Sequence, residues 1–150
     1  PSGNVSNGKI YLDLPGKLRL DYQKPNNLLI TCKGFWLTIQ NRNLKTTNNI
    51  PLESSPFSIL IKKSFDFENK SLMTYLNNEL GIISLKITKP GNNKLEQLIL
   101  EFSEKPFSLK KWLIKDTFGK ITTVLIQDAK YNNKLSYLLF FPDDFPDQIN

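Results

Sequence analysis

Histidine is missing from the 150-residue chain, and cysteine and arginine are scarce: the chain has one cysteine, Cys32, and two arginines, Arg19 and Arg42. The lack of histidine excludes Ser-His-Asp and Cys-His nucleophile pairs, histidine-ligated zinc and histidine general bases. A single cysteine excludes an intrachain disulfide and a metal site built from several cysteines. The sequence therefore predicts a protein that is not an enzyme and needs no cofactor.

Long apolar runs are also lacking. No segment reaches 18 consecutive apolar residues, so no membrane-spanning helix is predicted. Neither GxxxxGK[ST] nor GxGxxG occurs, so phosphate-binding loops of those two types are not expected. The chain begins at Pro1-Ser2-Gly3 without an initiator methionine, which indicates processing or trimming upstream.

Lysine is abundant instead. The two arginines leave 18 lysines among the 20 basic residues, and the net charge is +6. One explanation is the coding bias of a low-GC genome, and the other is an acidic partner, such as nucleic acid, an anionic membrane surface or an acidic protein. Nucleic acid is disfavoured because its readers prefer arginine for bidentate contacts and interleave basic residues with aromatic stacking platforms, which are absent here.

The dominant sequence period is two, which is typical of half-buried antiparallel strands. Residues 8–40 alternate apolar and polar side chains between turn signals such as Pro15-Gly16 and Lys33-Gly34, and they predict a four-strand meander. Residues 41–55 are polar and predict a loop. Residues 56–63 predict a short amphipathic helix, because two serines precede Pro56 and the apolar residues recur at helical spacing.

The second half of the chain returns to the strand period. Strands are expected at 71–76, 82–88, 95–101, 109–115, 121–128 and 135–141, with turns that include 90–93 and 116–119. About ten strands with one helix indicate a sandwich or a barrel, and no repeat or domain boundary divides residues 1–150. The inward-facing apolar residues are either a packed core or, in part, the lining of an apolar ligand cavity.

The few polar groups with possible chemistry have structural explanations. Asp143 and Asp144 follow Pro142 in a polar tail and are expected to be solvated. Asp116 begins a tight turn, where its side chain is expected to bond the turn backbone. Cys32 lies in a short apolar strand and is expected to be a buried thiol rather than a nucleophile.

Several segments, in this order and spacing, resemble the LolA family of periplasmic outer-membrane lipoprotein carriers. The resemblance spans nearly the whole chain, although no single motif in it is as specific as a phosphate-binding loop. The similar segments are Pro15–Tyr22 with Pro25, Cys32–Leu37, Pro56–Ile61, Leu98–Pro106 with Leu109 and Trp112, Asp116–Val124, and Phe140–Pro142.

The resemblance implies a mainly β fold with few helices: an incomplete, strongly curved antiparallel half-barrel with a short helical lid. It implies a monomeric periplasmic carrier that shields the acyl chains of lipoproteins between an inner-membrane ABC transporter complex and an outer-membrane acceptor protein. The expected acyl-binding residues are Leu12, Leu14, Leu18, Leu20, Trp36, Phe57, Leu60 and Ile61.

Two departures from the family pattern stand out. Well-known members have an arginine before the proline that Pro15 matches, where it is thought to hold the lid closed, and this chain has Leu14. Lid control therefore differs, or Arg19 takes over that role. The family's N-terminal helix and first strand are also not found in these 150 residues. Alternatives to the carrier are a cell-envelope interaction scaffold, the outer-membrane acceptor of the same fold, and a lipid hydrolase, for which no nucleophile and base are found.

Overall fold

The computed structural model describes residues 5–55, 58, 61, 73–79, 81–88, 97–116 and 118–145, with the backbone alone described for 73–79 and 107. The chain divides into two compact units. The first unit comprises residues 1–63 and 134–150, and the second comprises residues 64–133. That residues 1–150 act as one carrier domain stays a prediction.

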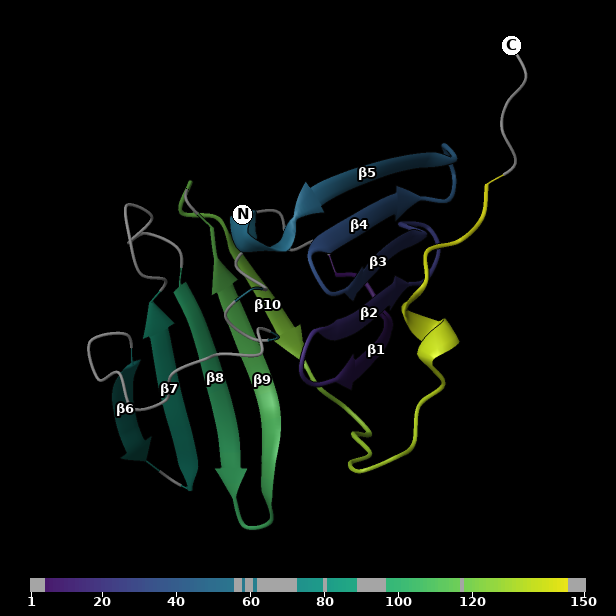
Figure 1. Cartoon of the computed structure of the whole chain (residues 1–150). Helices are drawn as coiled ribbons and strands as arrows, with labels where there is room; N and C mark the ends of the chain where they lie inside the picture. Colours follow the sequence, from purple (N-terminus) through teal and green to yellow (C-terminus); the bar gives the residue numbers. More distant parts are fainter. Residues whose placement is uncertain are drawn as a thin grey trace. The chain divides into compact units, whose positions relative to one another are not determined.

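The first unit is built on a five-stranded antiparallel meander (Figure 1). Its strands, which hydrogen-bond in chain order, are β1 (Gly8–Asp13), β2 (Lys17–Tyr22), β3 (Leu28–Lys33), β4 (Trp36–Asn41) and β5 (Thr46–Pro51). The predicted meander over residues 8–40 is confirmed. The predicted loop at 41–55 is wrong, because β5 pairs along the whole of β4 and the 3-10 helix η1 (Leu52–Ser54) follows it.

The strand register gives this sheet two chemically different faces. Leu12 on β1 lies opposite Leu18 on β2, which lies opposite Cys32 on β3. Their face, called the apolar face below, carries Ile10, Leu12, Leu18, Leu20, Ile30, Cys32, Leu37, Ile39 and Ile50. The other face, called the polar face, carries Arg19, Asp21, Thr31, Thr38, Gln40, Thr47 and Asn49. The polar face also carries the fully buried Leu29, and Thr31 and Gln40 on it are buried as well, so the sheet buries residues on both faces.

The C-terminal segment, residues 134–145, lies along the polar face and appears in yellow in Figure 1. A strand over 135–141 was expected there, and that prediction is wrong: Tyr137–Phe140 forms the 3-10 helix η2, which packs on β2 and β3. Ser136 caps this helix by accepting a hydrogen bond from the Leu138 N–H. Phe140 is fully buried, so one apolar side chain anchors the segment on the sheet.

The second unit is another five-stranded antiparallel meander. Its strands are β6 (Met73–Glu79), β7 (Ile82–Thr88), β8 (Gln97–Glu104), β9 (Phe107–Lys115) and β10 (Ile121–Leu125). All five were expected, with ends shifted by a few residues. Register places the buried Ile87, Leu98, Leu100, Trp112 and Ile114 on one face of this sheet.

The predicted turn at 116–119 is confirmed, since the Asp116 carboxylate accepts hydrogen bonds from the N–H groups of Phe118 and Lys120. The predicted turn at 90–93 lies outside the described residues, as does the predicted helix at 56–63 apart from Ser58 and Ile61, both of which are helical. The fold class is confirmed as mainly β with antiparallel sheets, and neither sheet closes into a barrel within the described ranges.

Candidate functional site

The apolar face of the first sheet is the largest grouping of predicted site residues. Leu18, Leu20, Cys32 and Leu37 are buried at its centre. The outer members of the face, including Leu12 on the edge strand β1, are half-buried. The nine members named above are aliphatic apart from the Cys32 thiol, and the register also places Tyr22 of β2 and the exposed Asn48 of β5 on this face. The face therefore offers mainly contact area for an apolar ligand.

Four of the eight predicted acyl-binding residues belong to this region. Leu12, Leu18 and Leu20 share the apolar face. Ile61 is fully buried, and its carbonyl accepts a 2.7 Å hydrogen bond from the Gly16 N–H in the β1–β2 turn. This bond ties a helical residue of the 56–61 segment to the end of the sheet. Phe57 and Leu60 lie outside the described residues.

The two remaining predicted residues point elsewhere. Leu14 lies in the β1–β2 turn, and its side chain is exposed. Trp36 lies on the polar face in register with Pro51, and it is exposed as well. The structure therefore does not bring Leu14 and Trp36 together with Leu18 and Leu20. The acyl-binding role of the whole predicted set stays a prediction.

A half-open hollow of about 400 Å³ lies on the polar face beneath the C-terminal segment. It is lined by Thr31, Lys33, Trp36, Thr38, Asn49, Phe140 and Pro142. Sequence reasoning missed it, because its walls come from strands and from a segment about 100 residues further along the chain.

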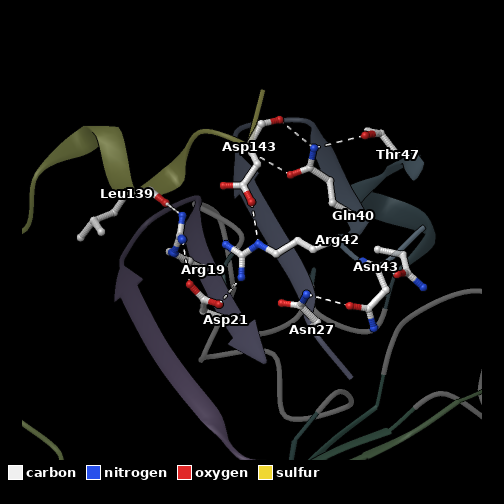
Figure 2. Close-up of polar contacts among 10 residues, drawn as sticks. Arg19, Asp21, Asn27, Gln40, Arg42, Asn43, Thr47, Leu139 and Asp143 are labelled. Atoms are coloured by element: carbon white, nitrogen blue, oxygen red, sulfur yellow. Dashed lines mark hydrogen bonds and ion pairs between the residues drawn. The ribbon is translucent and has the colours of Figure 1, made fainter. Parts of the chain in front are cut away.

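An alternating chain of charges fastens the C-terminal segment to the polar face (Figure 2). Arg42 donates to the carboxylates of Asp21 and Asp143, each at 2.6 Å, and Arg19 donates to Asp21 at 2.8 Å and to the Leu139 carbonyl at 3.0 Å. The prediction that Asp143 is solvated is therefore wrong. The two arginines of this lysine-rich chain were the sequence signal for the attachment, because a forked guanidinium is suited to bridging two acceptors and a lysine ammonium is not.

The buried Gln40 adds a second attachment. Its side-chain amide donates to the Asp143 carbonyl at 2.8 Å, and its side-chain carbonyl accepts from the Asp143 N–H at 2.7 Å. With these two bonds the Gln40 side chain pairs with the Asp143 backbone as the backbone of a neighbouring strand would. Gln40 thereby satisfies two backbone groups that no β-strand partner reaches.

These contacts change the acidity of the groups involved. Burial by itself would raise the pKa of Asp21, but the hydrogen bonds and charges of Arg42 and Arg19 outweigh it and hold that pKa below its ordinary value of 3.8. Burial raises the pKa of the Cys32 thiol, and Cys32 is 1% exposed. The expectation of a buried thiol is confirmed, and its burial disfavours the reactive thiolate.

Comparison with known proteins defines the class of this mainly β chain. A family model described as "Outer membrane lipoprotein carrier protein LolA" matches residues 1–143. The chain therefore belongs to the LolA family, as the sequence resemblance predicted.

A curated relative, the outer-membrane lipoprotein carrier protein of Methylobacillus flagellatus, is 27% identical over 129 residues, which are 83% of this chain and 62% of the relative. The chain thus spans about three fifths of that protein's length. A chain in the structure of the CwlD amidase from Clostridioides difficile in complex with the GerS lipoprotein has a similar fold, with a TM-score of 0.55, 15% identity and 85% of both chains covered. No helix among the described residues is long and apolar enough to cross a membrane.

Proposed function

We propose that the protein is a periplasmic lipoprotein carrier that shields acyl chains against the apolar face of the first sheet. The observation that carries the proposal is the mainly aliphatic surface to which all five strands, β1 to β5, contribute. Membership of the LolA family and the name of the curated relative support lipoprotein cargo. A carrier needs only to bury the acyl chains and later release them, and the aliphatic character of the face is consistent with that task.

Partial burial of the cargo suits such a carrier. Burying a methylene group contributes about 0.8 kcal/mol, so three acyl chains of about 16 carbons would contribute on the order of 35 kcal/mol if fully buried. Non-covalent affinity saturates near about 20 kcal/mol, and cargo bound that tightly would not be released. The half-buried outer residues of the apolar face, such as Leu12 and Ile50, offer the incomplete cover that release requires.

We further propose that residues 56–61 act as a helical lid over a half-barrel of which the first sheet is one wall. The Gly16–Ile61 backbone bond supports this placement, because it ties the helical residue Ile61 to the β1–β2 turn. Family members are thought to use an arginine side chain near this turn, and Leu14 cannot donate such a bond. The described bonds of Arg19 run to Leu139 and Asp21, so Arg19 holds the C-terminal segment rather than replacing that arginine.

The proposed partners follow from the carrier role. A monomeric carrier would receive lipoproteins from an inner-membrane ABC transporter complex and pass them to an outer-membrane acceptor protein. Nucleic acid is not a proposed partner. The basic net charge of +6 would steer encounters with an acidic acceptor.

A pair of neighbouring substitutions on β1 tests the proposal. Leu12 and Tyr11 are adjacent and both half-buried, but they face opposite sides of the sheet. Leu12→Glu places a charge on the apolar face and is expected to weaken binding of an environment-sensitive fluorescent acyl probe at least about tenfold. Tyr11→Glu, the matched control, is expected to bind the probe as the wild type does. Equal loss in both variants, with far-UV circular dichroism unchanged, would contradict the assignment of the apolar face.

A further inference from the structure

Three large exposed apolar side chains gather at one end of the first sheet. Leu14 is 56% exposed in the β1–β2 turn, Phe35 is 88% exposed in the β3–β4 turn, and Trp36 is 58% exposed at the start of β4. In an antiparallel meander these two turns lie at the same end of the sheet, as Figure 1 shows. Leu14, Phe35 and Trp36 are called the apolar tip below.

Backbone hydrogen bonds hold the apolar tip in place. The Gly34 N–H donates to the Gly16 carbonyl at 3.1 Å, which joins the two turns, and the Leu52 N–H donates to the Phe35 carbonyl at 2.8 Å. Gly16 and Gly34 adopt φ values of +88° and +110°, a region that glycine tolerates best. The apolar side chains are therefore presented to solvent by a hydrogen-bonded framework.

Two lysines lie directly beside the apolar tip. Lys17 on β2 and Lys33 on β3 are cross-strand neighbours, and like charges in that position repel each other. The repulsion is partly relieved within the chain: the Lys17 ammonium lies 3.5 Å from the Asp13 carboxylate, and the Lys33 ammonium lies 3.5 Å from the centre of the Phe141 ring. A surface with many negative charges would relieve it further.

We propose that the apolar tip is a docking surface for an anionic lipid bilayer. Tryptophan favours the headgroup level of a membrane, leucine and phenylalanine reach the acyl boundary, and lysines bind anionic headgroups. A second copy of the chain is a less suitable occupant, because two chains of net charge +6 repel each other. The proposal does not depend on the binding of acyl cargo, so it can be tested independently of the carrier function.

Flotation of the cargo-free full chain with vesicles tests the proposal. The chain is expected to bind vesicles of phosphatidylcholine with phosphatidylglycerol and to bind pure phosphatidylcholine vesicles weakly. Phe35→Ser should lower binding at least about tenfold, and Lys33→Gln should lower it about fivefold on the anionic vesicles. The matched control is Leu44→Ser: Leu44 is 68% exposed in the β4–β5 turn at the opposite end of the sheet, and its replacement should leave binding unchanged.

Tryptophan fluorescence locates the contact. The chain has two tryptophans, the exposed Trp36 and the fully buried Trp112. Brominated lipids should quench the wild type, and the Trp36→Phe variant, in which Trp112 is the remaining fluorophore, should lose most of that quenching.

Three results would overturn the proposal. The first is absence of binding to the anionic vesicles, and the second is an equal loss of binding in Phe35→Ser and Leu44→Ser. The third is a change of oligomeric state in Phe35→Ser by size-exclusion chromatography with vesicle binding intact, which would assign the apolar tip to self-association.

Discussion

At the scale of single residues, two neighbouring threonines on the polar face differ in whether their hydroxyl groups have a hydrogen-bond partner. Thr31 is buried, and its hydroxyl has no hydrogen-bond partner among the described residues. Thr38, its cross-strand neighbour on β4, donates a 2.7 Å hydrogen bond to the Asn49 side chain. A buried hydroxyl without a partner keeps the cost of its desolvation, whereas a satisfied one recovers it.

We therefore expect opposite effects from the same substitution at the two positions. Thr31→Val should raise the free energy of unfolding by about 1 kcal/mol, because valine has the same shape and no hydroxyl to desolvate. Thr38→Val should lower it by about 1 kcal/mol, because a made hydrogen bond is lost. Urea unfolding monitored by circular dichroism measures both changes. Destabilisation by Thr31→Val would show that its hydroxyl is satisfied in solution.

Alternation along the sequence grouped some of the predicted site residues on one face, whereas the family resemblance added a residue that lies on the other face. Alternation grouped Leu12, Leu18 and Leu20, and the register confirms that they share a face. Trp36 entered the predicted set through the family resemblance, and the register places it on the other face, because the β3–β4 turn pairs Cys32 with Leu37. Alternation within one strand does not reveal such a change of parity across a turn.

At the scale of elements, the sequence favoured strands with apolar alternation and missed a polar one. β5 carries Thr46, Thr47, Asn48 and Asn49, all exposed, so its strand character comes from pairing with β4 rather than from burial of apolar side chains. The apolar run at 137–141 was predicted as a strand for the opposite reason. There the capping serine Ser136 and the side-chain contacts of Arg19 and Gln40 decide the conformation, and none of these is visible from local sequence.

The attachment of the C-terminal segment is expected to weaken in acid. Because the folded pKa of Asp21 lies below its ordinary value of 3.8, its ion pairs stabilise the fold fully above that value. This stabilisation is lost as the pH falls through the lower folded pKa. Asp21→Asn should lower the free energy of unfolding by about 2 kcal/mol at neutral pH and should flatten the decline in acid. Urea midpoints measured across the acid range test both effects, and parallel pH curves for the wild type and Asp21→Asn would contradict this account.

At the scale of the whole molecule, the family is established and the site is proposed. The LolA family model covers residues 1–143, and the described residues form two antiparallel sheets. The composition, with no histidine and a single cysteine, is consistent with a site made of apolar surface. We propose that the apolar face binds the cargo and that the apolar tip, at one end of the same sheet, binds the membrane.

The most direct test of the carrier proposal is competition between a triacylated lipopeptide and the fluorescent acyl probe on the wild-type chain. The same peptide without its acyl groups is the control. We expect the acylated peptide to displace the probe and the control peptide to leave it bound. Displacement by both peptides to the same extent would contradict acyl recognition and would favour a protein-interaction scaffold that binds the peptide itself.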